Sequence, residues 1–367
     1  MRRSGPLAVA LAAVLAFGLG VALRPFDRTP AQRHPTLLQQ VRTELATRYY
    51  RPVPQRVLQL QSVPAMLAAL DDPYTRYLSR NELRLARRAV HEGYSGVGLT
   101  LLPGGKGLLV TRRPQGPAKL AGIRPGDTIL AVDGASVAGL PFEEALGRIL
   151  GRAGSTVRLR VLRGRHTFTF RVVRHRFKRP SVHARLTPER VGVIRIDRFS
   201  LHSGRLTAEA ARRLELAGAR GLVLDLRGNP GGLLSQAVAV ASLFLEQGRT
   251  IAALSGVHRR DALIFARAGA KSRLPLCVLV DGASASAAEV VAGALHDHGR
   301  ALIVGRPTYG KSLVQEIDTL PSGAALKLTV ASYRTPRGVD ISRRGVLPDV
   351  RTSRPLERAL ALLSVAT

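Results

Sequence analysis

The amino-acid sequence predicts a multidomain protein with an N-terminal helical segment, a β-rich domain containing two helices, and a layered α/β core. Apolar residues recur with a helical period of about 3.6 between residues 36 and 70. From residue 91, short apolar runs alternate with glycine turns, which is typical of a β-rich domain. From residue 191, strand-like and helix-like runs alternate, which indicates a layered α/β domain.

These changes of pattern divide the 367 residues, a length that suits two or three domains. We expect a signal or membrane anchor over residues 1–24 and a linker with a helical region over 25–90. The β-rich domain is expected over 91–170, the α/β core over 171–356, and a C-terminal helix or tail over 357–367.

The N-terminus resembles an export signal or a membrane anchor. Arg2 and Arg3 precede an uncharged, largely apolar stretch over residues 4–23, which is long enough to span a bilayer. The positive-inside rule keeps the arginine pair in the cytoplasm and sends the rest across the membrane. We therefore expect an exported protein, either membrane-anchored or periplasmic or extracellular, with a buried N-terminal helix as the alternative.

The charge of the chain is strongly basic, with 56 Lys and Arg against 25 Asp and Glu and a formal net charge of +31. A basic surface first suggests a nucleic-acid partner. However, 50 of the basic residues are Arg, and they are spread along the whole chain. We interpret the charge mainly as a compositional bias towards Arg, and expect no nucleic acid among the partners. The six Lys are the only basic side chains apart from His that can act as a general base, because a desolvated Lys can lose its proton whereas Arg cannot.

Three other motifs give only weak chemical signals. Cys277, the only cysteine, lies in an apolar run, and we expect it to be buried in the core. Ser286, near the start of the same expected helix, is a candidate nucleophile. The His-Asp-His run at 296–298 is too far along that helix from Ser286 to form a Ser-His-Asp catalytic triad, so we expect a solvated helix end. The stretch Gly305–Ser312 fits a phosphate-loop pattern, but a strand-like run follows it where a helix is required. We expect no metal and no cofactor.

Ser286 lies in the stretch that joins the apolar run at 276–280 to a helical pattern. It falls at the expected start of that helix, where main-chain N–H groups lack partners and the helix dipole is positive. Such a position can stabilise an oxyanion beside a nucleophile. A serine at this position is also a common N-cap, and this alternative stays open.

Lys311 comes twenty-five residues later, in Gly310–Gln315, which is expected to open another strand. The period-2 alternation of a strand puts Lys311, Leu313 and Gln315 on one face. A buried, neutral Lys can take the proton of a serine hydroxyl, and a Gln carbonyl can orient the amine. The alternative is an ordinary surface Lys.

The β-rich domain resembles a PDZ domain over about 75 residues. The stretch GPAKLAGIRPGDTILAVDG at 116–134 carries the resemblance. It implies that the main-chain N–H groups of Gly96, Val97, Gly98 and Leu99 hold the C-terminal carboxylate of a peptide that adds a strand to the sheet. An ordinary glycine-rich turn is the alternative for these four residues.

The chain from about residue 36 to 352 resembles the carboxy-terminal processing peptidases, exported serine endopeptidases with an embedded PDZ domain. The active-site signature of that family is matched by Ser284–Glu289, Gly310-Lys311 and Gln315. Four further stretches follow in the order of the family: Leu70–Leu78, Asp225–Gly232, Tyr333–Gly338 and Gly345–Asp349. Ala288 departs from the family, which usually has another Ser there.

The resemblance implies that the α/β core is a serine protease. It makes Ser286 the nucleophile, Lys311 the general base and Gln315 the group that orients Lys311. An oxyanion hole is implied at the Ala287 N–H together with an N–H from Gly231 or Gly232. The implied function is cleavage near flexible protein C-termini that the PDZ domain binds.

Two functions of other classes compete with this interpretation. A catalytically inactive PDZ scaffold of the same fold would bind peptides without turnover, and the intact Ser286, Lys311 and Gln315 count against it. A basic nucleic-acid binder would lose affinity steeply with salt, and the even spread of Arg counts against it.

Overall fold

The computed structural model describes residues 35–365 apart from 90–92, 179 and 270–271. The expected anchor over residues 1–24 lies outside the described residues. Within the described part of the chain, no helix is long and apolar enough to cross a membrane.

The helical segment contains α1 (Leu37–Arg48), α2 (Gln55–Leu58), α3 (Val63–Ala68) and α4 (Arg80–Ala89). The first three pack their apolar residues against Leu326, Leu328 and Val330 of strand β18 (Ala325–Arg334). The segment also contains a strand that the helical pattern does not predict, β1 (Arg76–Leu78), which pairs antiparallel with β18. Three residues are too few to show a period, so pairing with a strand some 250 positions away decides this conformation.

The β-rich domain has one sheet with the strand order β3-β4-β5-β7-β8, and β3 forms its edge. Val157, Leu159 and Val161 point from β7 into the domain core, as the alternating pattern predicts. The elements are β3 (Leu101–Gly104), β4 (Gly107–Val110), α5 (Gly116–Leu120), β5 (Thr128–Val132), β6 (Ala135–Ser136), α6 (Phe142–Ile149), β7 (Thr156–Arg163) and β8 (His166–Val173). Two short strands, β2 (Gly93–Gly96) and β9 (His175–Lys178), pair separately where the chain enters and leaves the domain.

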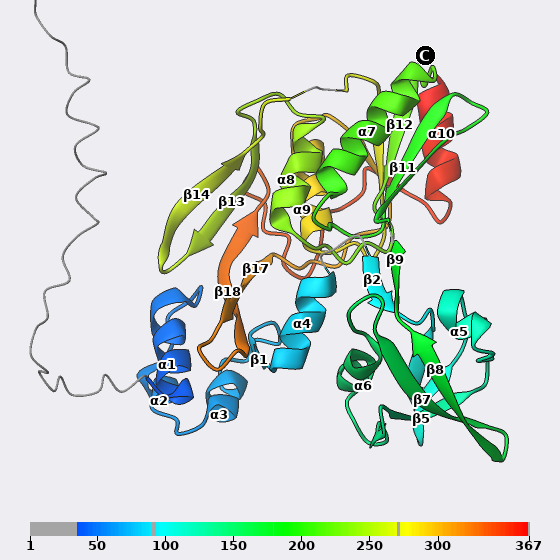
Figure 1. The fold of residues 1–367 in the computed structure, drawn as a ribbon. Coiled ribbons are helices and arrows are strands. Elements are labelled where there is room, and N and C mark those ends of the chain that lie inside the picture. Colours follow the sequence, from blue (N-terminus) through cyan, green and yellow to red (C-terminus); the bar gives the residue numbers. More distant parts are fainter. Residues whose placement is uncertain (1–34, 90–92, 179, 270–271, 366–367) are drawn as a thin grey trace, which may run out of the picture. The chain divides into compact units, whose positions relative to one another are not determined.

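The α/β core is built on a six-stranded sheet, β10-β11-β12-β15-β16-β19, in which every pair except β10–β11 is parallel. Helices α7, α8 and α9 cover one face and α10 covers the other (Figure 1). Both faces are therefore buried, which explains the continuous apolar runs of the central strands. The elements are β10 (Val182–Leu186), β11 (Val191–Ile196), α7 (Ser203–Leu216), β12 (Gly221–Asp225), α8 (Leu234–Ser242), β15 (Leu276–Val280), α9 (Ala287–Asp297), β16 (Leu302–Gly305), β19 (Val350–Arg351) and α10 (Pro355–Val365).

A second sheet joins the helical segment to the core, with the order β1-β18-β13-β14 and with β17 on β18. Its other strands are β13 (Thr250–Gly256), β14 (Arg259–Phe265) and β17 (Leu313–Thr319). The central strand β18 thus connects residues that precede the β-rich domain with residues that follow it. The predicted fold class, with a helical segment, a β-rich domain and an α/β core, is confirmed.

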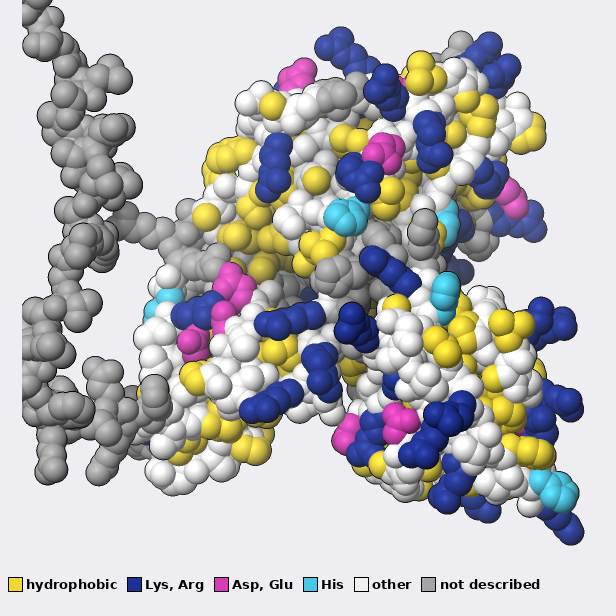
Figure 2. Space-filling view, viewed as in Figure 1, with side chains coloured by type: hydrophobic (Ala, Val, Ile, Leu, Met, Phe, Trp, Pro, Cys, Tyr) yellow, Lys and Arg dark blue, Asp and Glu magenta, His cyan; other side chains and the backbone are white. Residues whose placement is uncertain are grey.

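The basic side chains are distributed as the sequence suggests. Figure 2 shows Lys and Arg scattered over the visible face among apolar and polar side chains, without a single continuous stripe. Local ion pairs neutralise some of them, such as Arg163 with the buried Asp127 at 2.7 Å.

Cys277 lies in β15 and is 1% exposed. Burial raises the pKa of its thiol to about 11. Because the thiolate is the reactive form, we predict that the native protein does not react with a disulfide reagent at pH 8 and that one thiol reacts after unfolding. The absorbance of the released thiol measures both states, and rapid labelling of the folded protein would contradict the buried position.

Candidate active site

Ser286 is held at the junction of β15 and α9 by a tightly bonded loop. The Asp281 carboxylate accepts the N–H groups of Ala283 and Ser284, and the buried Ser284 hydroxyl donates to Leu226 O at 2.8 Å. Ser286 occupies the N-cap position of α9, which confirms that it stands at the start of the helix.

The backbone of Ser286 has φ 55° and ψ −115°, a conformation that favours glycine. Ser286 and Glu289 form a capping box at this helix start, in which the main-chain N–H of Ser286 donates to Glu289 Oε2 at 2.7 Å. Ser286 is thus an N-cap, as the alternative interpretation expects. Its strained backbone is nevertheless not that of an ordinary N-cap, which is extended, and it is typical of functional sites.

Glu289 is fully buried and connects the Ser286 loop to the Lys311 loop. Its Oε2 accepts the N–H of Ser286 and, at 2.9 Å, the N–H of Lys311. Its Oε1 accepts the Thr308 hydroxyl at 2.5 Å and the Gly310 N–H at 2.7 Å. Charge-assisted hydrogen bonds of this kind are stronger than neutral ones, and here four converge on one carboxylate.

Tyr333 of β18 makes a second connection between the same two loops. Its hydroxyl lies 3.0 Å from Ser286 O and 2.8 Å from Lys311 O, and donates to this carbonyl pair. Burial, followed by the nearby Glu289 charge, raises the pKa of Tyr333 well above its ordinary value, so the hydroxyl stays protonated. Residues 286 and 311 are thus held together through their main chains.

Lys311 is largely withdrawn from solvent, and its Nζ lies 4.5 Å from the centre of the Tyr74 ring. Burial, followed by the charge of Lys327, lowers the pKa of Lys311 to about 8 against the opposing effects of Asp72 and Glu289. The surface-Lys alternative is therefore wrong. At pH 7 a group with this pKa is neutral in roughly a tenth of the molecules.

Lys311 precedes strand β17, contrary to expectation. We expected the strand to open at Gly310 with Lys311, Leu313 and Gln315 on one face, but β17 begins at Leu313. A register shift between Val314 and Gln315 also breaks the period of two. The main-chain bonds to Glu289 position Lys311 ahead of the strand, so alternation does not apply to it.

Gln315 pairs with Thr329 of β18, and its Nε2 lies 3.5 Å from Thr329 Oγ1. Thr329 Oγ1 lies 3.2 Å from the Thr75 hydroxyl, which donates to Asp72 Oδ2 at 2.7 Å. Gln315 is therefore connected to the helical segment. Between Gln315 and Lys311 no hydrogen bond is found among the described residues.

Gly231 lies directly against the Ser286 loop. A Cβ built on it would come within 2.9 Å of Ser286 Cβ and 3.0 Å of Ala287 N, so a side chain there would fill the space in front of that amide. The Gly231 N–H donates to Asn229 Oδ1 at 2.8 Å. Gly232 has no such bond through its own N–H within the described part of the chain, and Ala287 opens helix α9.

Gly96 ends strand β2, where it pairs with His175 of β9, and Val97, Gly98 and Leu99 form the loop that leads to the edge strand β3. The carbonyls of this loop face the start of α5, because the Val97 and Gly98 oxygens accept the N–H groups of Ala118 and Gln115 at 2.9 and 2.8 Å. Gly98 has φ 87°, and a Cβ there would collide with Gln115 O. Within residues 93–178, β3 pairs only with β4, so its outer edge is open.

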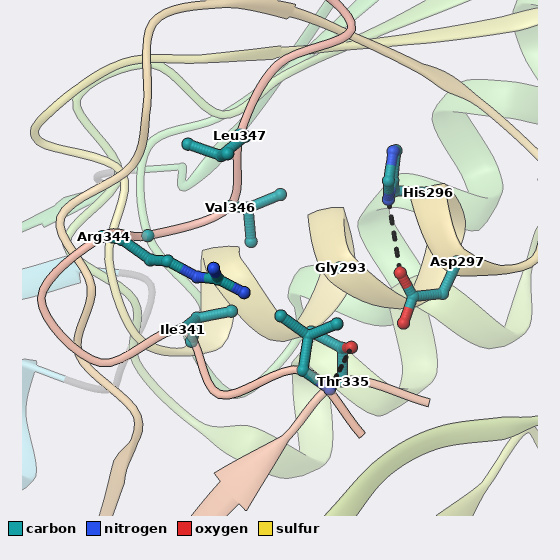
Figure 3. A pocket seen from close by; sticks show the side chains of 10 residues that line it. Gly293, His296, Asp297, Thr335, Ile341, Arg344, Val346 and Leu347 are labelled. Atoms are coloured by element: carbon teal, nitrogen blue, oxygen red, sulfur yellow. Dashed lines mark hydrogen bonds and ion pairs between the residues drawn. The ribbon is translucent and has the colours of Figure 1, made fainter. Parts of the chain in front are cut away.

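The His-Asp-His run is not a solvated helix end, contrary to expectation. Asp297 is buried and accepts the Arg337 N–H at 2.9 Å, and His296 lies between Asp297 and Asp349 at 3.2 and 3.1 Å. His296 and Asp297 line a cavity of about 160 Å³, to which Thr335 and Arg344 also contribute (Figure 3). The segments 335–337 and 345–349 cover the end of α9 because they pack back onto the core. The described residues form no cluster that could hold a metal ion.

Several residues of the site receive no individual role from the sequence. They are Asp72, Tyr74, Thr75, Glu289, Lys327, Thr329 and Tyr333. All but Lys327 and Thr329 lie in stretches that carry the family resemblance, and Glu289 also fits the capping-box pattern of a Glu three residues after a serine at a helix start. The others come together through long-range packing, which no local pattern reveals.

Two parts of the chain match known protein families. Residues 190–352 match peptidase family S41, and residues 110–163 match the PDZ domain. A carboxyl-terminal-processing protease of Picosynechococcus sp. is 38% identical over 310 residues, with 82% of this chain and 74% of the relative covered. Carboxy-terminal processing protease CtpA of Bacillus subtilis is 32% identical over 320 residues, with 87% and 69% covered.

A solved structure shares the fold. The photosystem II D1 C-terminal processing protease superposes with a TM-score of 0.57 at 31% sequence identity, covering 89% of this chain and 96% of that structure. Fold and site together define a serine-type peptidase that carries a PDZ domain. The chain belongs to peptidase family S41, among the carboxyl-terminal processing proteases.

Glu289→Gln should disrupt the connection between the two loops. An amide has one acceptor oxygen, and its NH₂ group would face N–H donors, so buried groups would lose their partners. We predict a loss of unfolding free energy on the order of 3 kcal/mol, measured by urea denaturation. Glu246→Gln, at an exposed position, is the matched control and should change little; equal stability of the two variants would refute the role of Glu289.

Proposed function

We propose that this peptidase cleaves proteins near flexible C-termini through an acyl-enzyme, with Ser286 as nucleophile, Lys311 as general base and Gln315 as the group that orients Lys311. The observation that carries the proposal is the pairing of residues 286 and 311 through Glu289 and Tyr333. A serine with a strained backbone at a helix start and a lysine with a pKa of about 8 are thereby held close together through their main chains.

The proposed reaction has two halves. Neutral Lys311 Nζ accepts the proton of the Ser286 hydroxyl while Oγ attacks the scissile carbonyl carbon. The tetrahedral intermediate collapses, the C–N bond breaks, and the Lys311 ammonium returns the proton to the leaving amine. Water then attacks the ester, Lys311 accepts a proton from that water, and it returns the proton to Ser286 Oγ as the acyl group leaves.

The oxyanion that forms in each half needs fixed donors. We assign them to the Ala287 N–H, at the positive end of α9, and to the N–H of Gly232. The choice of Gly232 over Gly231 rests on the hydrogen bond that engages the Gly231 N–H with Asn229. The role of Gly231 is then steric, because it keeps the space beside Ala287 N empty.

The PDZ domain is proposed to bind the C-terminus of the substrate. The open edge of β3 is available for a peptide strand, and the N–H groups of Gly96, Val97, Gly98 and Leu99 precede that edge. The Val97 and Gly98 carbonyls already bind residues 118 and 115 at α5, and Gly96 pairs with His175 of β9. An inactive scaffold would keep this binding and lack turnover, and the organised Ser286–Lys311 region favours the enzyme.

We also propose that the peptidase works on the outer side of the cytoplasmic membrane. The support is the sequence of residues 2–23, with its arginine pair and its apolar stretch of bilayer length.

Ser286→Ala should abolish cleavage of an unfolded substrate such as casein, and Lys311→Arg should reduce kcat/KM by about 10²–10⁴-fold, because Arg keeps the charge but cannot accept the proton. In the wild type, kcat/KM should rise with pH and level off above about 8, since the base must be neutral. Gel and fluorescence assays from pH 6 to 10 measure this. Lys119→Arg, on the exposed side of α5, is the control. Full activity of Ser286→Ala would refute the assignment of Ser286 as the nucleophile.

Amidation of the C-terminus of a substrate peptide should weaken its binding to the Ser286→Ala form by about 10–100-fold, because charge-assisted hydrogen bonds are lost. Fluorescence anisotropy measures the Kd without turnover. A peptide with an internal Glu→Gln change loses the same charge elsewhere and should bind normally. Equal affinity for the free and the amidated peptide would exclude carboxylate recognition by this loop.

A further inference from the structure

A cavity of about 160 Å³ lies between helix α9 and the segment that follows β18 (Figure 3). Neither Ser286 nor Lys311 lines it, and the proposed function gives it no role. Its lining comes from the C-terminal part of α9 and from residues 335–347. The apolar part of this lining consists of Val339, Ile341, Val346 and Leu347.

The size and the lining of the cavity suit a small aliphatic group. Ile341 and Val346 are 1% and 5% exposed, whereas Leu347 is 47% exposed and reaches solvent. A Cβ on Gly293 would come within 3.0 Å of Thr335 Cγ2, so a side chain at this position of α9 would narrow the space. Because a cavity of about 150 Å³ with aliphatic walls can hold a benzene molecule, a branched chain of about five carbon atoms fits here.

The polar groups around the cavity differ in whether they already have partners. His296 lies 3.2 Å from Asp297 and 3.1 Å from Asp349. Asp297 also accepts the Arg337 N–H at 2.9 Å. Arg344, by contrast, forms no ion pair within the part of the chain that the structure describes, and Figure 3 shows its side chain beside the cavity.

The charge of Arg344 is therefore available to a ligand. The charge acts on Asp340 from a distance, but the Asp340 carboxylate accepts the Ser342 N–H at 2.8 Å and is not paired with Arg344 among the described residues. A guanidinium group binds a carboxylate through two parallel N–H donors. A carboxylate ligand at this arginine would place its chain in the apolar part of the cavity.

The wall of the cavity also holds the loop that carries Lys311. The Arg343 N–H donates to Gly310 O at 3.1 Å. The Val346 N–H donates to the Thr308 hydroxyl at 2.7 Å. The segment that lines the cavity is thus bonded on its other side to the residues just before Lys311.

We propose that this cavity binds a short branched-chain carboxylate, with the carboxylate at Arg344 and the chain against Ile341 and Val346, and that the bound ligand holds the Lys311 loop in place. A ligand that binds only one arrangement of its site stabilises that arrangement. The arrangement here includes the bonds between the cavity wall and the Lys311 loop. The proposal goes beyond the proposed function and does not depend on the catalytic roles of Ser286 and Lys311.

Isothermal titration calorimetry with 4-methylpentanoate tests the binding. We expect a Kd on the order of 1 mM for the wild type, which is ordinary for so small a ligand. Arg344→Gln should weaken binding about tenfold, because a charge-assisted hydrogen bond is lost. The uncharged 4-methylpentanamide should bind the wild type about tenfold more weakly and should not respond to Arg344→Gln. Acetate keeps the charge but lacks the chain, and it should also bind about tenfold more weakly.

Two controls locate the ligand. Arg343→Gln makes the same change at the neighbouring residue, which does not line the cavity, and should leave the Kd unchanged. An excess of substrate peptide should not displace the ligand. Displacement by the peptide together with full affinity in Arg344→Gln would place the ligand on the PDZ domain and overturn the proposal, as would the absence of saturable binding to the wild type.

Hydrogen–deuterium exchange tests the effect on the Lys311 loop. At a ligand concentration of about ten times the Kd, exchange in residues 308–312 should slow by up to about tenfold, as in residues 341–347. Ser286→Ala should show the same protection, because the effect needs no turnover, and Arg344→Gln should show less. Protection confined to residues 341–347 would contradict the connection to the Lys311 loop. An active Ser286→Ala form would refute the proposed mechanism and leave these results unchanged.

Discussion

One buried carboxylate holds the site together. Glu289 has no access to solvent, and its two oxygens take four hydrogen bonds from two loops that lie more than twenty residues apart in the chain. A buried charge is tolerated only when it is fully bonded, so the positions of these donors are not free to vary. Ser286 keeps its strained backbone because this carboxylate accepts its N–H.

The second sheet also connects the Ser286 loop to the Lys311 loop. Tyr333 of β18 bonds to the carbonyls of Ser286 and Lys311, and β18 also pairs with β1 and β17. Through these pairs, Asp72, Tyr74 and Thr75 of the N-terminal segment reach the candidate base. The PDZ domain is therefore inserted between two parts of the chain that build one site. This explains why a short helical segment precedes it.

Much of this arrangement follows from the sequence, and some of it cannot. The central strands were predictable because both faces of the sheet are covered, which produces continuous apolar runs. Ser286 at the start of α9 was predictable for a similar reason, since a buried strand precedes it and a largely apolar helix follows. Strand β1 was not predictable, because its three residues depend on a distant partner. The face assigned to Lys311 was wrong because a bulge and the bonds to Glu289 override the period of the strand. Asp297 was expected in solvent, but the segment around Arg337 covers it.

The central claim is that Ser286 becomes nucleophilic only when Lys311 is neutral. The most direct measurement is the rate at which an activated ester acylates the protein between pH 6 and 10, with the modified residue located by peptide mass spectrometry. We predict a single adduct on Ser286 whose rate of formation rises through pH 8 and is lost in Lys311→Arg. An adduct on another residue, or a Ser286 rate that Lys311→Arg leaves unchanged, would contradict it.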